Sequence, residues 1–187
     1  PTDSECNYGG ELPQDAYNEM LDFIKRHPEF TVYNVMLAAY RVLMFRYTGQ
    51  SNLIIGSTMA NRNRIEVRNL IGFFANTLPL TTNVQTEDSF FEVLNKEKET
   101  INEGIAYQQV SFDKLVSIMH PDRRPGENPL FQTMFTYVQS GKTDLELSNL
   151  TVEALKADKS SSAFDLTIGL NDTGSGVQLF YEYNNDK

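Results

Sequence analysis

The spacing of apolar residues predicts two helices in the first quarter of the chain. Across Gln14–Arg26, apolar side chains recur every three or four positions, as they do along one face of a helix. His27-Pro28 ends this segment, because proline cannot continue a helix. Thr31 is the predicted N-cap of a second helix that extends to about Tyr47, with Gly49 as its C-cap.

Two further helices are predicted in the middle of the chain. Asp88-Ser89 opens a long amphipathic helix that runs to about Ala106. A short helix is expected from Phe112 to Met119, with Ser111 as its N-cap and His120-Pro121 at its end.

Short apolar runs bounded by polar turns predict the strands. The turn-forming residues 171–176 separate the last two runs, which we interpret as a hairpin. Because helices and strands alternate at first and the chain ends in β structure, we expect an α/β fold, a two-layer sandwich with a mixed β-sheet covered by helices. The polar segment 1–12, which contains Gly9-Gly10, is expected to be a connector outside the core. The predicted strands are 53–59, 74–82, 131–138, 151–155, 164–170 and 177–183.

Composition and charge argue against a nucleic-acid-binding or membrane protein. Of 187 residues, 40% are hydrophobic and 22% charged, as in ordinary globular domains. The formal net charge of −9 does not suit binding to a phosphate backbone. No apolar run reaches the ~18 residues of a membrane span, and no signal-peptide pattern opens the chain, so we expect a cytoplasmic location. Cys6 is the single cysteine and is expected to be a reduced thiol.

Four segments with distinctive residues follow one another along the chain. They are Ala60 to Arg64, Ile71 to Thr77, Tyr107 to Leu115 and Glu127 to Gln132. The first is a basic turn after an apolar strand, and the second places a glycine beside two phenylalanines and an amide. In this order and spacing they resemble the C-terminal half of a condensation domain from a nonribosomal peptide synthetase, and the resemblance covers nearly the whole chain.

The resemblance implies a fold similar to that of chloramphenicol acetyltransferase. Condensation domains consist of two such lobes, with the active site in the cleft between them. Residues 1–187 would be the C-terminal lobe, and 1–12 the linker from an N-terminal lobe that this sequence does not contain. Asn61 to Phe73 would supply the floor of the cleft, and part of Phe164 to Tyr183 would be a latch that crosses to the sheet of the other lobe.

The resemblance also implies peptide-bond formation. An aminoacyl amine on one carrier protein attacks the thioester of an acyl or peptidyl group on another. The family's catalytic motif, His-His-x-x-x-Asp-Gly, belongs to the N-terminal half, whereas this chain has only His27 and His120, far apart. We therefore assign no catalytic residue here and expect the chain alone to be inactive.

The implied partners are the N-terminal lobe and the upstream and downstream peptidyl carrier proteins. These carriers would bring the phosphopantetheine arms, so we expect no cofactor on this chain. We expect no metal either, because the two histidines lack ligand spacing.

The candidate residues for the substrate cleft come from the family motifs. Gly72 is expected where the chain turns tightly between large aromatic residues. The amide of Asn76 either orients a substrate or the pantetheine arm, or ties down a loop backbone. The full set is Asn61, Arg62, Gly72, Phe73, Phe74, Asn76, Thr77, Gln108, Phe112, Arg123 and Asn128.

Two motifs depart from the family pattern. The segment 107–113 keeps Gln108 and Phe112 but differs at Tyr107, Gln109, Ser111 and Asp113, so we interpret it as structural, with Phe112 as a core anchor and no catalytic role for Asp113. In the segment 123–130, Glu127 stands where the pattern has its second arginine. A carboxylate cannot replace a guanidinium fork, so this part of the cleft would have an altered arrangement.

Several alternatives remain open at this point. The arginines at 62, 64, 68, 123 and 124 either form a solvated rim or contact the phosphate of a pantetheine arm or an acidic carrier. The rival functions are an ester-forming acyltransferase of the same superfamily and a noncatalytic interaction module. The apolar hairpin over 164–183 further predicts that the isolated chain self-associates.

Overall fold

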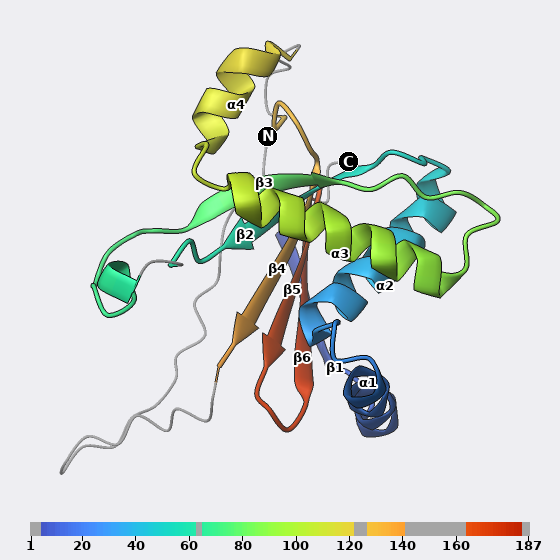
Figure 1. Ribbon diagram of the computed structural model, residues 1–187. Helices are drawn as coiled ribbons and strands as arrows, with labels where there is room; N and C mark the ends of the chain where they lie inside the picture. Colours follow the sequence, from blue (N-terminus) through green and yellow to red (C-terminus); the bar gives the residue numbers. More distant parts are fainter. Residues whose placement is uncertain (1–4, 63–64, 122–126, 141–163, 185–187) are drawn as a thin grey trace.

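The computed structural model describes residues 5–62, 65–121, 127–140 and 164–184. Six strands form one sheet in the order β1-β6-β5-β4-β2-β3, and α1, α2 and α3 lie on one side of it (Figure 1). The predicted two-layer α/β sandwich is thus confirmed. The strands are β1 (Glu5–Glu11), β2 (Ile54–Met59), β3 (Asn76–Thr81), β4 (Thr133–Gln139), β5 (Leu166–Asp172) and β6 (Val177–Asn184). The helices are α1 (Gln14–Arg26), α2 (Val32–Thr48), the single 3-10 turn η1 (Ile65–Val67), α3 (Phe90–Tyr107) and α4 (Phe112–Met119).

The sheet is mixed, as predicted. Strand β4 runs parallel to both of its neighbours, β2 and β5. The other pairs, β2–β3, β5–β6 and β1–β6, are antiparallel. This arrangement places the parallel pairs at the centre of the sheet, where both sides of the backbone are hydrogen-bonded.

The helix boundaries follow from capping side chains. Thr31 accepts a hydrogen bond from the backbone N–H of Asn34, whose side chain bonds back to Thr31, and Gly49 ends α2 in the left-handed region at φ 69°. Ser89 and Glu92 make the same reciprocal pair of bonds at the start of α3, and at the start of α4 the Ser111 hydroxyl group accepts from the backbone N–H of Lys114. These four caps are the predicted ones. In the described part of the chain, no helix combines the length and the apolar character that crossing a bilayer requires.

The main core lies between the sheet and the helices. Leu37 on α2, Ile55 on β2 and Phe135 on β4 are each no more than 1% exposed. Burial of a large apolar side chain contributes about 1.5–3 kcal/mol relative to exposure. The core includes Tyr17, Met20, Leu37, Tyr40, Ile55, Leu78, Leu80, Ile101, Phe135, Ile168, Leu170 and Val177.

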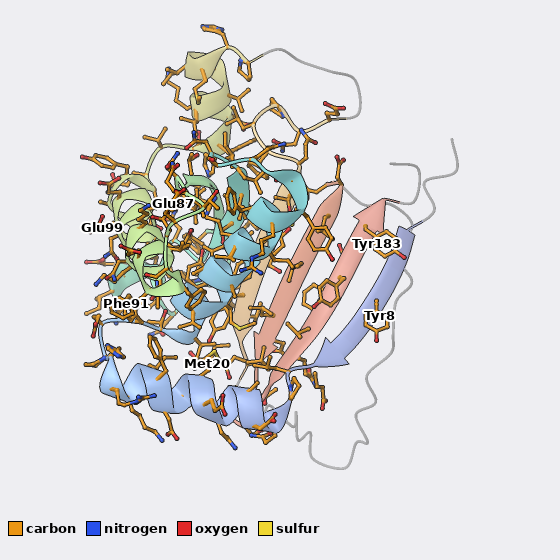
Figure 2. The ribbon with its side chains drawn as sticks, turned by 90° about the vertical axis from the view of Figure 1, so that its right-hand side faces the viewer. Tyr8, Met20, Glu87, Phe91, Glu99 and Tyr183 are labelled. Carbon is orange, nitrogen blue, oxygen red and sulfur yellow. The ribbon has the colours of Figure 1, made fainter. Side chains whose placement is uncertain are left out.

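The expectation that residues 1–12 form a connector is wrong for Glu5–Glu11, whereas their expected place outside the core holds for residues 8–11, which are exposed or half-buried. These residues form β1, which pairs with β6 from Glu5↔Asn184 to Glu11↔Gln178. Their polar composition reflects the edge of the sheet, where Figure 2 shows Tyr8 and Tyr183 beyond the cover of the helices. Tyr8 is 69% exposed. That this segment leads from another lobe stays a prediction.

The predicted hairpin is confirmed as β5 and β6, joined by a turn in which Gly174 has φ 77°. The assignment of these residues to a latch is wrong, because β5 pairs with β4 and β6 while β6 pairs with β5 and β1. Ile168, Leu170 and Val177 are buried in this chain's own core. The prediction that the chain self-associates through this hairpin assumed unpaired strands, which the structure does not show, and the prediction itself stays untested. The strand expected at 151–155 lies outside the described residues.

Candidate functional site

The segment that follows β2 is organised around Arg62. Asn61 adopts φ 50°, a left-handed conformation that Asn tolerates better than most residues. The Arg62 guanidinium then donates from Nη1 to the carbonyl oxygens of Val67 (2.6 Å) and Leu70 (2.8 Å), and from Nη2 to that of Gly72 (3.1 Å). Arg62 thus binds backbone carbonyl groups rather than standing free on a rim.

The two phenylalanines of the second motif differ in how much of their side chains is exposed. Phe74 is half-buried, and its ring lies under the Arg62 guanidinium with 4.5 Å from Cζ to the ring centroid. Phe73 is 93% exposed. A Cβ on Gly72 would lie 3.1 Å from Cε2 of Phe74, a tight contact that glycine avoids. The strand predicted to start at Phe74 accordingly starts two residues later.

Asn76 opens β3 and ties it to the turn between α3 and α4. Its Nδ2 donates to the carbonyl oxygens of Gln108 (2.7 Å) and Val110 (3.1 Å), and its Oδ1 accepts from the backbone N–H of Thr77 (3.0 Å). Both amide hydrogens are therefore directed at protein carbonyls. This geometry favours the loop-tying alternative for Asn76 over substrate orientation. Thr77 pairs with Thr58 in the β2–β3 ladder.

The described side chains of the third motif make contacts within the chain. Gln108 is 4% exposed, and its Nε2 donates to the carbonyl oxygen of Ile105 (2.9 Å). Phe112, the first residue of α4, packs edge-on against Phe131 with 5.6 Å between ring centroids. Phe131 in turn fills the space above Gly56 on β2. These contacts attach α4 to the sheet, above which it stands in Figure 1.

Asn128 shapes the entry into β4. Its Oδ1 accepts from the backbone N–H groups of Leu130 (3.1 Å) and Phe131 (3.3 Å), and its carbonyl oxygen accepts from Nε2 of Gln132 (2.7 Å). Because it orients Phe131, Asn128 belongs to the same group of contacts as Phe112. Arg123, the remaining predicted residue, lies outside the described residues, as do Arg64 and Arg124.

Most of the described motif residues belong to two groups of contacts. One is Arg62 with Gly72 and Phe74, and the other runs from Asn76 through the 108–112 turn to Phe131. His27 stands apart, with its ring tilted against that of Phe23 at 4.6 Å between ring centroids, and His120 ends α4. Within the described residues, no group of three or more His, Cys, Asp or Glu side chains is placed to bind a metal ion. This arrangement can shape a cleft wall.

A cleft that the sequence did not suggest lies where β2 ends. It has a volume of about 310 Å³ and adjoins the start of the Arg62 segment through Ala60. Tyr33 and Tyr137 line it, and the Tyr33 hydroxyl is 2.8 Å from Oγ of Ser57. Burial raises the pKa of both tyrosines well above its ordinary value. The Tyr137 hydroxyl group donates to Oδ2 of Asp172 (2.8 Å), so both tyrosine hydroxyl groups have partners within the protein.

Comparisons with known proteins identify the family of this chain. The family model "Condensation domain" matches residues 10–187. The chain is 32% identical over 175 residues to gramicidin S synthase 2 of Brevibacillus brevis, an alignment that covers 94% of this chain and 4% of that protein. It is 37% identical over 153 residues to bacitracin synthase 3 of Bacillus licheniformis, which covers 82% of this chain and 2% of the synthase. The chain therefore spans only a small part of the curated relatives that it matches.

Solved structures share the fold at lower sequence identity. The condensation domain of the monacolin K polyketide synthase MokA superposes with a TM-score of 0.84 at 22% identity, covering 99% of this chain and 43% of that one. A four-domain nonribosomal peptide synthetase bound to AMP and glycine gives a TM-score of 0.86 at 19% identity, covering 98% of this chain and 15% of that chain. With the family match over almost its whole length, the chain belongs to the condensation-domain family and has its chloramphenicol acetyltransferase-like fold.

Proposed function

We propose that this chain is the C-terminal lobe of a condensation domain that forms peptide bonds between carrier-bound substrates. The observation that carries the proposal is the family match over residues 10–187, together with coverage of only 43% of the MokA condensation-domain chain. This chain provides one sheet with its covering helices, and a second lobe of the same fold would complete the cleft.

In this proposal the chain builds the cleft and the other lobe supplies the proton-transfer group. The described motif residues bind one another and the backbone, which suits a wall that holds two substrates in line. Holding two reactants in a productive geometry is a large part of the catalysis of a bimolecular reaction. The histidine motif of the other lobe would orient or deprotonate the attacking amine. This chain alone would be inactive.

The proposed substrates reach the cleft on partner proteins. Upstream and downstream peptidyl carrier proteins would each present a thioester on a phosphopantetheine arm, in the cytoplasm. The cleft beside Ala60 suits part of such a substrate, because apolar side chains line it together with a few polar ones, among them Asn102. No cofactor held by this chain itself is part of the proposal.

The test is a condensation assay on the polypeptide that contains this chain. Donor and acceptor carriers are loaded with aminoacyl groups, and the dipeptidyl thioester is detected by mass spectrometry. The proposal expects product from the whole polypeptide and none from residues 1–187 alone. Product from the 187-residue chain by itself would contradict the assignment to a lobe without catalytic residues.

A second candidate, a noncatalytic interaction module, is favoured by one specific residue. Glu127 occupies the position where the family motif carries an arginine. The fold is compatible with this second function. The X-domain from teicoplanin biosynthesis, in a structure of its complex with OxyB, has the same fold, with a TM-score of 0.84 and 20% identity. In this reading the cleft would bind a partner without turnover.

The variant Glu127→Arg separates the two candidates. If the peptide-forming arrangement is kept, the arginine is tolerated or raises turnover modestly in the loaded-carrier assay. A polypeptide that forms no product with either residue, although both carriers are fully loaded, supports the interaction module and contradicts the catalytic proposal.

A further inference from the structure

The segment between η1 and β3 exposes an unusual amount of apolar surface. Ile65 is 75%, Leu70 53%, Ile71 104% and Phe73 93% exposed. Figure 1 shows η1 and its surroundings as a projection beyond the ends of β2 and β3. Large apolar side chains gathered on a projecting surface mark an interaction site rather than ordinary scatter.

Backbone hydrogen bonding alone holds this projection weakly. Among the described residues 65–74, the backbone bonds that stabilise the turn are Arg68 N–H to Ile65 O at 3.4 Å and Leu70 N–H to Val67 O at 3.3 Å. Both distances are at the long end for N–H···O bonds. Another interaction must therefore fix the shape of the segment.

The Arg62 guanidinium supplies that interaction. Its three bonds, to the carbonyl oxygens of Val67, Leu70 and Gly72, are 2.6, 2.8 and 3.1 Å long and span the segment from its helical turn to its return. Bonds with a charged donor are shorter and stronger than neutral ones. The ring of Phe74 closes the other side of the guanidinium plane. The Arg62 side chain thus connects the helical turn of the projection to the residues that lead back to β3.

Only arginine suits this position. Its planar fork presents donors in fixed directions and stacks on an aromatic face, whereas lysine is a compact charge without a plane. Asn61, immediately before Arg62, contributes a left-handed backbone conformation at φ 50°. Gly72 contributes by leaving room for the Phe74 ring.

We propose that Arg62 is the positioning residue of this projection, and that it preorganises Leu70, Ile71 and Phe73 for contact with the other lobe of the domain. The contact part rests on the proposed function. The occupant is assigned from the length of chain outside this structure, because more than half of the MokA condensation-domain chain has no counterpart here. The largest exposed side chains of the projection, Ile71 and Phe73, are apolar, and the exposed charges beside them, Glu66 and Arg68, are of opposite sign, which suits an apolar face of a protein rather than a phosphate-bearing arm.

The first arm of the test measures the shape of the projection without reference to activity. Hydrogen exchange is followed by mass spectrometry on peptides that cover residues 65–74, in the whole polypeptide and in its Arg62→Ala, Arg62→Lys and Arg68→Ala variants. We expect Arg62→Ala to speed exchange about 10-fold or more and Arg62→Lys to do so less. Arg68 lies exposed on the same segment and serves as the matched control, with no change expected. Equal exchange in Arg62→Ala and the parent would overturn the positioning role.

The second arm measures condensation per folded, carrier-loaded enzyme. We expect Arg62→Ala to lower kcat about 10-fold or more, with the KM for the loaded carrier and the melting temperature little changed, because a misplaced cleft wall affects reaction geometry. Arg62→Lys should recover part of kcat. Faster exchange with an unchanged kcat would keep the positioning role but overturn the contact with the other lobe. A parent polypeptide without condensation activity would refute the proposed function and leave the exchange result standing.

Discussion

Arg41 on α2 and Glu97 on α3 form an ion pair that is closed off from solvent, with 1% and 0% of their side chains exposed. Arg41 donates from Nε and from Nη2 to the two carboxylate oxygens, the latter over 3.2 Å. Its remaining donors reach the carbonyl oxygens of Leu53 (2.6 Å) and Leu80 (3.0 Å). The pair therefore joins two helices to β3 and to the residue that leads into β2.

Removing one partner of this pair should be strongly destabilising. Glu97→Ala leaves an unpaired guanidinium in the interior, and we expect the free energy of unfolding to fall by about 3–5 kcal/mol. The control is Glu99→Ala, which removes an exposed carboxylate from the same helix (Figure 2) and should change stability by less than about 0.5 kcal/mol. Urea unfolding of the two variants measures the difference. Similar losses in both would contradict the importance of the buried pair.

Asn76→Ala tests the tie between β3 and the α3–α4 turn. The substitution leaves the carbonyl oxygens of Gln108 and Val110 without their donor, and we expect a loss of about 1–3 kcal/mol in unfolding free energy. Asn76→Asp should also destabilise, because a carboxylate cannot donate to either carbonyl. Glu103→Ala, at an exposed position of α3, is the control. Loss of condensation with unchanged stability would instead favour substrate orientation by Asn76.

The helices and their caps could be predicted because their determinants are local. The hydroxyl groups of Thr31 and Ser111 cap N–H groups three residues away, so the capping pattern is visible in a short window of sequence. The hairpin was visible for the same reason, since a turn-forming run joins β5 to β6. The family motifs likewise indicated which loops would be structured.

Features that depend on distant residues could not be predicted. β1 is a strand because Glu5 to Glu11 meet β6 at the opposite end of the chain, while their own sequence is polar and rich in glycine. Arg41 stands in an apolar helical run, a signal that its side chain is buried, but its partner is 56 residues away. The bonds of Arg62 end on backbone carbonyl groups, which no side-chain pattern reveals.

Two glycines in the sheet should respond differently to alanine. A Cβ on Gly56 would lie 2.1 Å from the ring of Phe131, which is 3% exposed and held by its surroundings. A Cβ on Gly169 would lie 1.6 Å from the ring of Phe180, but that ring is 38% exposed and can turn outward. We expect Gly56→Ala to cost about 1–3 kcal/mol and Gly169→Ala less, as measured by urea unfolding. The reverse order would show that the Phe180 ring, and not Phe131, is fixed.

The stability of the chain should fall in alkaline solution through its buried tyrosines. Burial raises the pKa of Tyr40 from 10.0 to about 12. Below pH 10 both folded and unfolded chains keep this proton, so the stabilisation is fully present. Between pH 10 and 12 the unfolded chain loses the proton while the folded chain retains it. The free energy of unfolding should therefore decrease by about 1.4 kcal/mol per pH unit from this residue alone.

The Tyr40→Phe variant isolates this contribution. In the parent, the Tyr40 hydroxyl group is hydrogen-bonded to Oγ1 of Thr133. Thr133 Oγ1 also donates to the carbonyl oxygen of Leu166 (3.2 Å), so the substitution does not leave Thr133 without a hydrogen-bond partner. We expect the slope of stability against pH to become shallower between pH 10 and 12, although Tyr33 and Tyr137, whose pKa values burial also raises, retain part of it. Tyr47→Phe, at an 82% exposed site, should keep the parent slope. Coincident slopes for Tyr40→Phe and the parent would show that the Tyr40 proton is released equally by the folded and unfolded chains.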